Sequence, residues 1–416
     1  MRINNISNTG FSGVIKPFSD SRGVYIIPIN SVPSSRQIRE AVKITADGKQ
    51  LPMEGYNGRA YYLGKDLVVK KYKGKEEALN DDPMREIKIL DKMYEHDMAF
   101  KNSQNGCYAF KTPDGEYYLV STKVKGESPQ IGITPFTKEN LQSIVDIAAQ
   151  MDMGAAINGS SKNGFSDRCR FMNYDFNGKN IKVTSKSAGL FDFEYAGIEN
   201  IDDELYKIMK SKQISASCHQ SDTSRLASNL RTFECFTLYE YLMRTDNPDE
   251  IFDDYLKIKS NYHNSMANFY NKFVKESAFP DFARLISQKE AAHSRLLAGD
   301  NTGKIPFDIK KAEAIKIQMS VFIHNQSSFC ETGEVNPAQL YRFAHNGINY
   351  FKDELQKAKH AGDKDRQIYF KDCLQLFCDW RQVNKTIEAK IEQNNPKIIR
   401  KLTNDYIPML TDILKV

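Results

Sequence analysis

The chain of 416 residues lacks several features that would assign a protein to a class at once. It has no apolar run near the ~18 residues that a membrane-spanning helix needs, so we expect no membrane span. Its seven cysteines are odd in number and include no CxxC pair, which argues against a zinc site or a disulfide framework and for a reducing compartment. The net charge of +5 comes from interspersed residues rather than from a basic block, so we expect no nucleic-acid partner.

The N-terminus also lacks the apolar core of a standard secretory signal. Residues 1–10 are instead rich in Asn, Ser and Thr. We therefore expect a cytoplasmic protein with a frayed terminus. The alternative is that this polar start is an export signal for a contact-dependent bacterial secretion system, so that the chain is an effector acting in another cell's cytosol.

Secondary-structure patterns divide the chain into four parts. Residues 1–43 have frequent Gly, Ser, Pro and Asn and predict a poorly ordered N-terminal arm with one strand at 23–28. Residues 44–126 are strand-like with one helix after Asn80, and residues 127–300 are mostly helical. Residues 301–416 are helical throughout. Strands followed by helices predict an α+β unit with an all-helical extension.

Breaks between the later helices are indicated by Gly, Asn and Pro. They are predicted near residues 247–248, 299–306, 333–337, 362 and 395–396. The apolar stripes of these helices are typical of core packing.

A glycine-containing hairpin is the first segment that indicates chemistry. Gly55 and Gly58 precede a predicted strand at 59–63, and a turn at 64–66 leads into a second strand at 67–72. Glycines at such a bend allow backbone amides to approach a phosphate group closely. An ordinary surface hairpin would show the same pattern.

Alternation along the second strand places Val68, Lys70 and Tyr72 on one face. Val68 could then contact a purine ring while Lys70 reaches the phosphates. A register slip of one residue would put Lys71 in the place of Lys70.

The next helix carries a carboxylate on its apolar face. Residues 80–83 offer an N-cap acceptor followed by Pro83 at the first helical position, which predicts where the helix begins. Glu86 lies on the face of Leu90 and has no basic residue three or four positions later. Such a carboxylate needs a cation from elsewhere, for which Lys70 is the natural candidate. The alternative is a Glu at the edge of the stripe, in contact with water.

These segments resemble the N-terminal lobe of protein-kinase-like folds, which has a glycine-rich loop, a strand lysine and a helix with a partner glutamate. Strands predicted at 107–110 and 117–122 continue the resemblance, and residues 124–126 resemble the hinge between the lobes. The resemblance implies that ATP is held by Gly55, Gly58, Val68, Lys70 and Val124. It also implies that Glu86 pairs with Lys70. Met53 stands where the family has its first glycine.

Three polar residues follow a helix predicted at 138–158, in the order that phosphoryl transfer uses: Asp167, Asn173 and Asp192. The reaction needs one carboxylate to orient the acceptor hydroxyl, and oxygen ligands to hold magnesium against the phosphates. Asp192 lies in an apolar run, where a lone carboxylate is costly unless it is paired or bound to metal. The alternative is that Asp192 caps a turn.

The run LFDFEYA at 190–196 resembles the metal-binding motif of choline kinases and aminoglycoside phosphotransferases. The resemblance implies that Asp192 binds Mg²⁺, that Asp167 is the catalytic base and that Asn173 helps to hold the metal. Two positions depart from the family. Phe165 takes the place of the usual histidine, and Asn173 lies one residue farther from Asp167 than the family spacing.

The sequence thus predicts a bilobal protein-kinase-like fold with a β-rich N-lobe (44–126), a helical C-lobe (127–300) and a helical extension (301–416). The leading hypothesis is a phosphotransferase that uses ATP and Mg²⁺ and acts on a hydroxyl of a small molecule or a protein. The second is a pseudokinase, a nucleotide- or partner-binding module whose C-terminal helices contact a protein. The third is an unrelated helical scaffold with a chance motif match.

Overall fold

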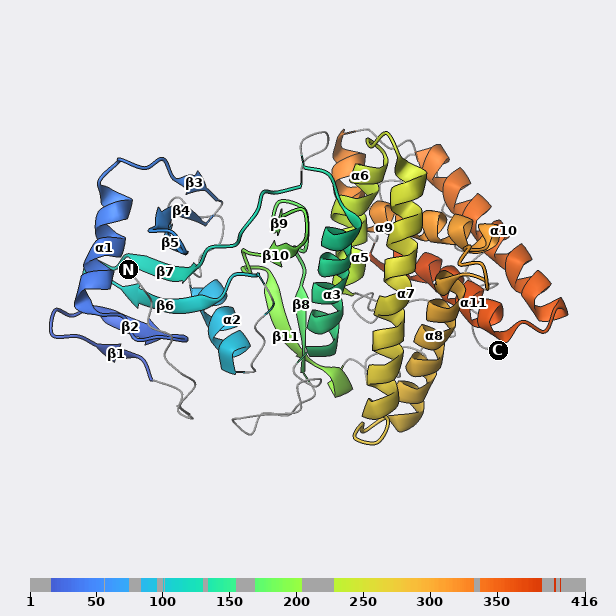
Figure 1. Cartoon of the computed structure of the whole chain (residues 1–416). Helices are drawn as coiled ribbons and strands as arrows, with labels where there is room; N and C mark the ends of the chain where they lie inside the picture. Colours follow the sequence, from blue (N-terminus) through green and yellow to red (C-terminus); the bar gives the residue numbers. More distant parts are fainter. Residues whose placement is uncertain are drawn as a thin grey trace. The chain divides into compact units, whose positions relative to one another are not determined.

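The structure is a computed structural model in which one large antiparallel sheet and many helices make a mixed α and β architecture (Figure 1). It describes residues 16–55, 57–74, 84–95, 100, 102–129, 134–154, 169–203, 228–332, 337–383, 393 and 397. The chain divides into two compact units. The first comprises residues 1–125, 154–169 and 189–198, and the second comprises residues 126–153, 170–188 and 199–416.

A seven-stranded antiparallel sheet forms the centre of the first unit, in the order β1-β2-β6-β7-β5-β4-β3. Its strands are β1 (Phe18–Ser19), β2 (Tyr25–Pro28), β3 (Met53–Glu54), β4 (Gly58–Leu63), β5 (Leu67–Tyr72), β6 (Gly106–Lys111) and β7 (Tyr117–Thr122). The predicted hairpin is present as β4 and β5, with Ala60 opposite Lys70. β5 also pairs with β7, so Lys70 lies on an interior strand whose backbone is fixed on both sides.

Helix α1 (Ser35–Ala46) covers one face of this sheet. A capping box starts it: the Gln37 backbone N–H donates to Ser34 Oγ, and the Gln37 side chain accepts from the Ser34 N–H. Ile38 and Ala41 of α1 pack in one apolar cluster with Val69 of β5. Burial of these side chains is the main force that holds α1 on the sheet.

Residues 16–46 therefore differ from the poorly ordered arm that the sequence suggested for 1–43. The single strand expected at 23–28 is β2, and its Ile26 is 2% exposed. β2 pairs with β6, which ties this part of the chain into the sheet. Gly23 lies between β1 and β2, and Pro33 and Ser34 directly precede α1. Residues 1–15 are outside the described residues.

Helix α2 (Met84–Glu95) buries its predicted apolar face, including Leu90 and Met93. Its predicted start at residues 80–83 lies outside the described residues. Since successive residues of β5 point to opposite faces, Val69 points toward α1 while Lys70 points toward α2. The apolar cluster under α1 and the Lys70–Glu86 pair therefore lie on opposite faces of β5.

The second unit is mainly helical. It contains α3 (Lys138–Met153), α5 (Asn229–Phe233), the π-helical turn η3 (Glu234–Leu238), α6 (Tyr239–Leu242), α7 (Pro248–Phe273), α8 (Pro280–Ala298), α9 (Phe307–Thr332), α10 (Pro337–His360) and α11 (Lys364–Val383). Four predicted helix breaks are confirmed, because helices end or begin at 248, 298–307, 332–337 and 360–364. The fifth, at 395–396, lies outside the described residues.

Two short sheets complete the fold: β8 (Cys169–Asn173) pairs with β11 (Ala196–Asn200), and β9 (Ile181–Val183) pairs with β10 (Ala188–Leu190). No helix among the described residues combines the length and the hydropathy that crossing a bilayer requires.

A buried ionic network joins several helices of the second unit. Glu313 of α9 is 0% exposed and accepts from Lys259 at 2.8 Å, from Lys316 at 2.9 Å and from the Tyr369 hydroxyl at 2.7 Å. Lys259 also contacts Glu234, which lies in the π-helical turn. Burial raises the pKa of Glu313, but Lys259 and Lys316 outweigh this effect and hold that pKa well below its usual value.

Candidate functional site

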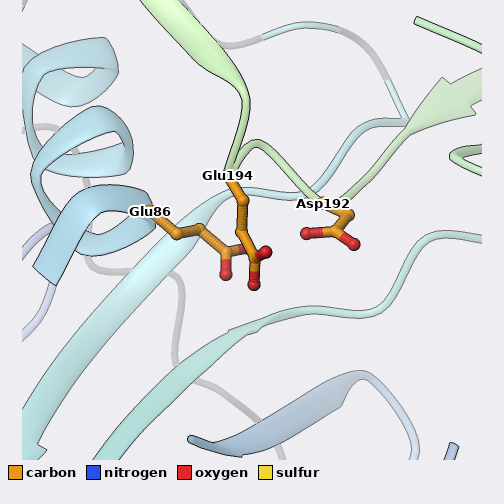
Figure 2. Close-up of side chains that lie close together, drawn as sticks. All are labelled: Glu86, Asp192 and Glu194. Atoms are coloured by element: carbon orange, nitrogen blue, oxygen red, sulfur yellow. The ribbon is translucent and has the colours of Figure 1, made fainter. Parts of the chain in front are cut away.

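Lys70 lies at the centre of a cluster of charged side chains in the first unit. Its Nζ is 2.8 Å from Glu86 Oε2 and 3.4 Å from Asp192 Oδ1, and it also contacts Glu194 Oε1. A strand, a helix and a loop supply these groups, as Figure 2 shows for the three carboxylates. The pair that the sequence suggested between Lys70 and Glu86 is therefore present, and Asp192 lies beside it.

Glu86 is held firmly by groups other than Lys70. Its side chain is 1% exposed, and its Oε2 also accepts from the Tyr72 hydroxyl at 2.9 Å. Its Oε1 accepts from Gln104 Nε2 at 3.2 Å. Each carboxylate oxygen thus has a donor, which a buried charge requires if its desolvation is to be offset.

Asp192 and Glu194 belong to the segment between β10 and β11. Asp192 has a φ of +62°, a left-handed conformation that costs a residue with a side chain about 1 kcal/mol or more. Its backbone N–H donates to Gln104 Oε1 at 2.8 Å. Glu194 accepts from Asn57 Nδ2 at 2.6 Å, so it joins the glycine turn to Lys70.

The protonation states follow from this crowding. Burial lowers the pKa of Lys70, but Glu86, Asp192 and Glu194 outweigh it and raise that pKa above its usual value. Partial burial raises the pKa of Asp192 to about 6; Glu86 and Glu194 add to the rise and Lys70 opposes it. Burial, with the Glu86 charge next in size, raises the pKa of Tyr72 well above its usual value. Lys70 therefore stays charged, and Tyr72 stays a hydrogen-bond donor.

The donor set fits a hard divalent cation. Among the described residues, Glu86, Asp192 and Glu194 each offer an oxygen, and these oxygens lie within 4.8 Å of one another. Carboxylate oxygens are the ligands that Mg²⁺ prefers. The Asp192 side chain is 38% exposed, so a cation could reach it without unfolding the segment. Three carboxylates around one ammonium group also leave negative charge that a divalent cation would balance.

The two glycines form the turn that leads into β4. The Gly55 N–H donates to the Gly58 carbonyl at 2.9 Å, and Lys73 Nζ donates to the Gly55 carbonyl at 2.8 Å. A Cβ at Gly58 would stand 3.0 Å from Lys70 Cε and 3.0 Å from the Lys71 carbonyl oxygen. A side chain there would push Lys70 aside, so this position favours glycine because Lys70 lies directly beneath it.

The structure also resolves the choice between Lys70 and Lys71. Lys71 points to the opposite face of β5, where it pairs with Glu116 and lies 5.8 Å from the centre of the Tyr118 ring. Lys71 therefore cannot replace Lys70 beside Glu86 in this register.

The expected adenine contacts lie in the same unit as the cluster. Val68 shares the Lys70 face of β5 and is half-buried. Val124 is 9% exposed, and its Cγ1 would lie 2.9 Å from a Cβ at Gly189. Val124 thus packs against the segment that carries Asp192.

The remaining predicted site residues are Asn173 and Asp167. Asn173 belongs to the second unit and is 0% exposed; its Oδ1 accepts from the Asp175 N–H at 3.0 Å. Its backbone N–H donates to Asn229 Oδ1 at 2.8 Å, and its Nδ2 has no hydrogen-bond partner among the described residues. Asp167 and Phe165 lie outside the described residues.

Sequence reasoning missed four members of the cluster. Glu194 stands inside the LFDFEYA run two positions after Asp192, so the motif itself could have indicated it. Tyr72 follows Lys70 by two residues on the same strand face. Asn57 and Gln104 give no sequence signal, because their roles depend on contacts with residues far away in the chain.

Comparisons with known proteins add little to this geometry. No family model matches the chain. No curated protein matches it either. Among solved structures, an amicoumacin kinase, hAmiN, in complex with AMP-PNP, Ca²⁺ and Ami is similar over 63% of this chain and 94% of that chain. The identity is 10% and the TM-score 0.29, which is too low to establish a shared fold. Function is therefore inferred from the side chains.

Proposed function

We propose that this chain is a phosphotransferase that uses ATP and Mg²⁺ and has a bilobal kinase-like fold with a helical extension over residues 301–416. The acceptor is a hydroxyl of a small molecule or a protein. We place it in a cytoplasm, either that of the producing cell or, if it is an exported effector, that of another cell. The observation that supports the proposal best is the convergence of Lys70, Glu86 and Asp192 from a strand, a helix and a loop.

Lys70 is the residue proposed to contact the phosphates. Glu86 fixes its position through the 2.8 Å ion pair, and the Tyr72 hydroxyl fixes Glu86 in turn. Lys70 also contacts Asp192 and Glu194. Phosphate binding therefore requires that Lys70 exchange part of these contacts for contacts with phosphate oxygens.

Asp192 and Glu194 are proposed to hold the magnesium ion, with Glu86 as the third nearby carboxylate. When bound, the ion supplies positive charge against the phosphates and balances the charge that develops during transfer. The carboxylates serve two partners in this scheme. They orient Lys70, and the same oxygens would hold the cation.

The nucleotide itself is proposed to lie along β4 and β5. Backbone groups of Gly55 and Gly58 approach the phosphates, while Val68 and Val124 contact the purine ring. Asp167 is proposed to accept the proton of the acceptor hydroxyl, and this role stays a prediction from the sequence.

A pseudokinase is the second candidate, and one observation favours it. Asn173, proposed from its sequence position as a second metal ligand, is fully buried, and its Oδ1 already accepts from the Asp175 N–H. The extra residue between Asp167 and Asn173 would then reflect the loss of a metal ligand. In that case the cluster around Lys70 would bind a nucleotide without transferring phosphate, and the C-terminal helices would bind a partner.

Turnover separates the two candidates. An active kinase hydrolyses or transfers the γ-phosphoryl group of ATP only with Mg²⁺, and Asp192→Asn should abolish this activity while the circular dichroism spectrum is retained. Asp146→Asn is a matched control, because Asp146 lies on an exposed face of α3 and accepts a hydrogen bond from Gln142 on the same helix. If the turnover of the wild type is no higher than that of Asp192→Asn, the kinase hypothesis is excluded and the pseudokinase hypothesis is left.

A further inference from the structure

Gln104 occupies an unusual place in the first unit, in the connection between α2 and β6. It is 7% exposed, and its side chain lies between the helix carboxylate and the Asp192 segment. Neither its neighbours in the sequence nor any motif indicates a function for it.

The Gln104 amide makes hydrogen bonds at both ends. Its Oε1 accepts from the Asp192 backbone N–H at 2.8 Å. Its Nε2 donates to Glu86 Oε1 at 3.2 Å and to Ser121 Oγ at 3.2 Å. An amide suits this place because it offers an acceptor to the N–H and a donor to the carboxylate at once. A carboxylate would oppose Glu86, and an apolar side chain would leave buried polar groups without partners.

The backbone around Gln104 fixes the same segment. The Gln104 N–H donates to the Leu190 carbonyl at 2.7 Å, and the Leu190 N–H donates to Ser103 Oγ at 2.9 Å. A Cβ at Gly189 would stand only 2.1 Å from the Asn102 carbonyl oxygen. Residues 102–104 therefore pack closely against residues 189–192 and fix their backbone.

The Asp192 backbone needs such support. Its left-handed φ of +62° persists only where the surroundings fix it. The hydrogen bond from the Asp192 N–H to Gln104 Oε1 fixes that peptide directly. The side-chain amide of Gln104 also donates to Glu86, which positions Lys70.

We infer that Gln104 is a positioning residue that links the Lys70–Glu86 pair to Asp192, so that the phosphate-binding ammonium group and the cation-binding carboxylate keep one relative geometry. This inference rests on the proposed function. In this scheme Gln104 acts through its hydrogen bonds to Glu86 and to the Asp192 backbone. Loss of the Gln104 side chain should change the cation affinity and the rate of phosphoryl transfer, because both depend on placing Lys70 and Asp192 within a fraction of an ångström.

Two substitutions remove the link in different ways. Gln104→Leu keeps the size and loses all three bonds, and Gln104→Glu sets a carboxylate against Glu86. Loss of a hydrogen bond to a charged group should weaken Mn²⁺ affinity and lower kcat for Mg²⁺-dependent ATP turnover by about 10-fold or more. Ser121→Ala is the matched control, because it removes one partner of Gln104 and keeps the bonds to Glu86 and Asp192.

A charge exchange gives a sharper test. In Gln104→Glu with Glu86→Gln, the amide and the carboxylate trade places, so that both can still bond each other, Lys70 and the Asp192 N–H. Gln104→Glu should therefore weaken Mn²⁺ binding about 10-fold in the wild type but by less than about 3-fold in a protein that already carries Glu86→Gln, a coupling that a purely structural loss of packing would not produce.

Mn²⁺ binding, with and without AMP-PNP, is measured by electron paramagnetic resonance beside steady-state kinetics. Unchanged Mn²⁺ affinity and kcat in Gln104→Leu, with only a lower melting temperature, would overturn the inference and leave the proposed function intact. A wild-type protein that binds neither Mn²⁺ nor AMP-PNP would overturn the proposed function, and the inference with it. An equal effect of Gln104→Glu on Mn²⁺ affinity in the wild type and in Glu86→Gln would also count against the link.

Discussion

Glu194→Gln is the substitution with the most specific expected outcome, because Glu194 affects two ligands in opposite directions. The side chain contacts Lys70 and accepts from Asn57 at 2.6 Å. It is one of three carboxylates around a single ammonium group. Without a cation, this excess of negative charge repels a polyphosphate. With a cation, the same oxygen becomes a ligand.

The magnitude follows from Coulomb's law. A unit charge about 5 Å from a phosphate, at an effective dielectric constant of about 20, interacts with it by about 3 kcal/mol. Loss of even half of that repulsion should strengthen cation-free binding of AMP-PNP about tenfold. Loss of one oxygen ligand should weaken Mn²⁺ binding by a similar factor. The difference between AMP-PNP affinity with a cation and without one should therefore become much smaller in Glu194→Gln.

Isothermal titration calorimetry tests both effects. AMP-PNP is titrated in EDTA and in excess Mg²⁺, and Mn²⁺ is titrated alone. Glu116→Gln is the matched control, because Glu116 pairs with Lys71 on the opposite face of β5. The electrostatic reasoning would be refuted if Glu194→Gln bound AMP-PNP in EDTA no more tightly than the wild type or the control variant did.

Two further predictions concern the second unit. Glu313→Leu leaves Lys316 buried without its carboxylate, so it should lower the free energy of unfolding by about 3–5 kcal/mol in urea titrations. Glu240→Gln breaks an exposed pair with Arg244 and should change that free energy by less than about 1 kcal/mol. Similar losses in both variants would contradict a net role for the buried network. Burial lowers the pKa of His293 to about 4, with Lys316 and His263 acting in the same direction and Asp372 opposing them. Because the folded pKa is depressed, the stability that neutral His293 contributes is complete above pH ~6.5 and is lost as the pH falls toward 4, by up to roughly 3 kcal/mol. His293→Phe should therefore flatten the decline of unfolding free energy between pH 7 and pH 4.5, and equal slopes for the two proteins would count against this explanation.

Local sequence patterns determined much of the fold. The β4–β5 hairpin, α2 and four of the later helix breaks lie where Gly, Pro and apolar periodicity indicated them. These features depend on residues close together in the chain, so a sequence pattern is enough to predict them. The pairing of Lys70 with Glu86 was also predictable, because an unpartnered carboxylate on an apolar helix face needs a cation.

Features that depend on distant contacts were not predictable in this way. Residues 16–46 have a composition typical of a loose arm, yet β2 is held by pairing with β6, about 80 positions later in the chain. Gln104 is a polar residue in a connection, and only its bond to the Asp192 segment gives it significance. The register of Lys70 and Lys71 required the strand pairing itself, since the sequence permits either lysine.

The most direct test of the central claim is a thermal-shift titration with ATP and Mg²⁺, comparing the wild type with Lys70→Met and with Lys71→Met, which alters the opposite face of the same strand. A ligand at 100 times its dissociation constant stabilises a protein by about 2.7 kcal/mol, which gives a clear rise in melting temperature. We predict this rise in the wild type and in Lys71→Met, and its absence in Lys70→Met, whatever the starting stability of each variant. An equal rise in Lys70→Met, or none in the wild type, would contradict the claim that Lys70 and its carboxylates form a nucleotide site.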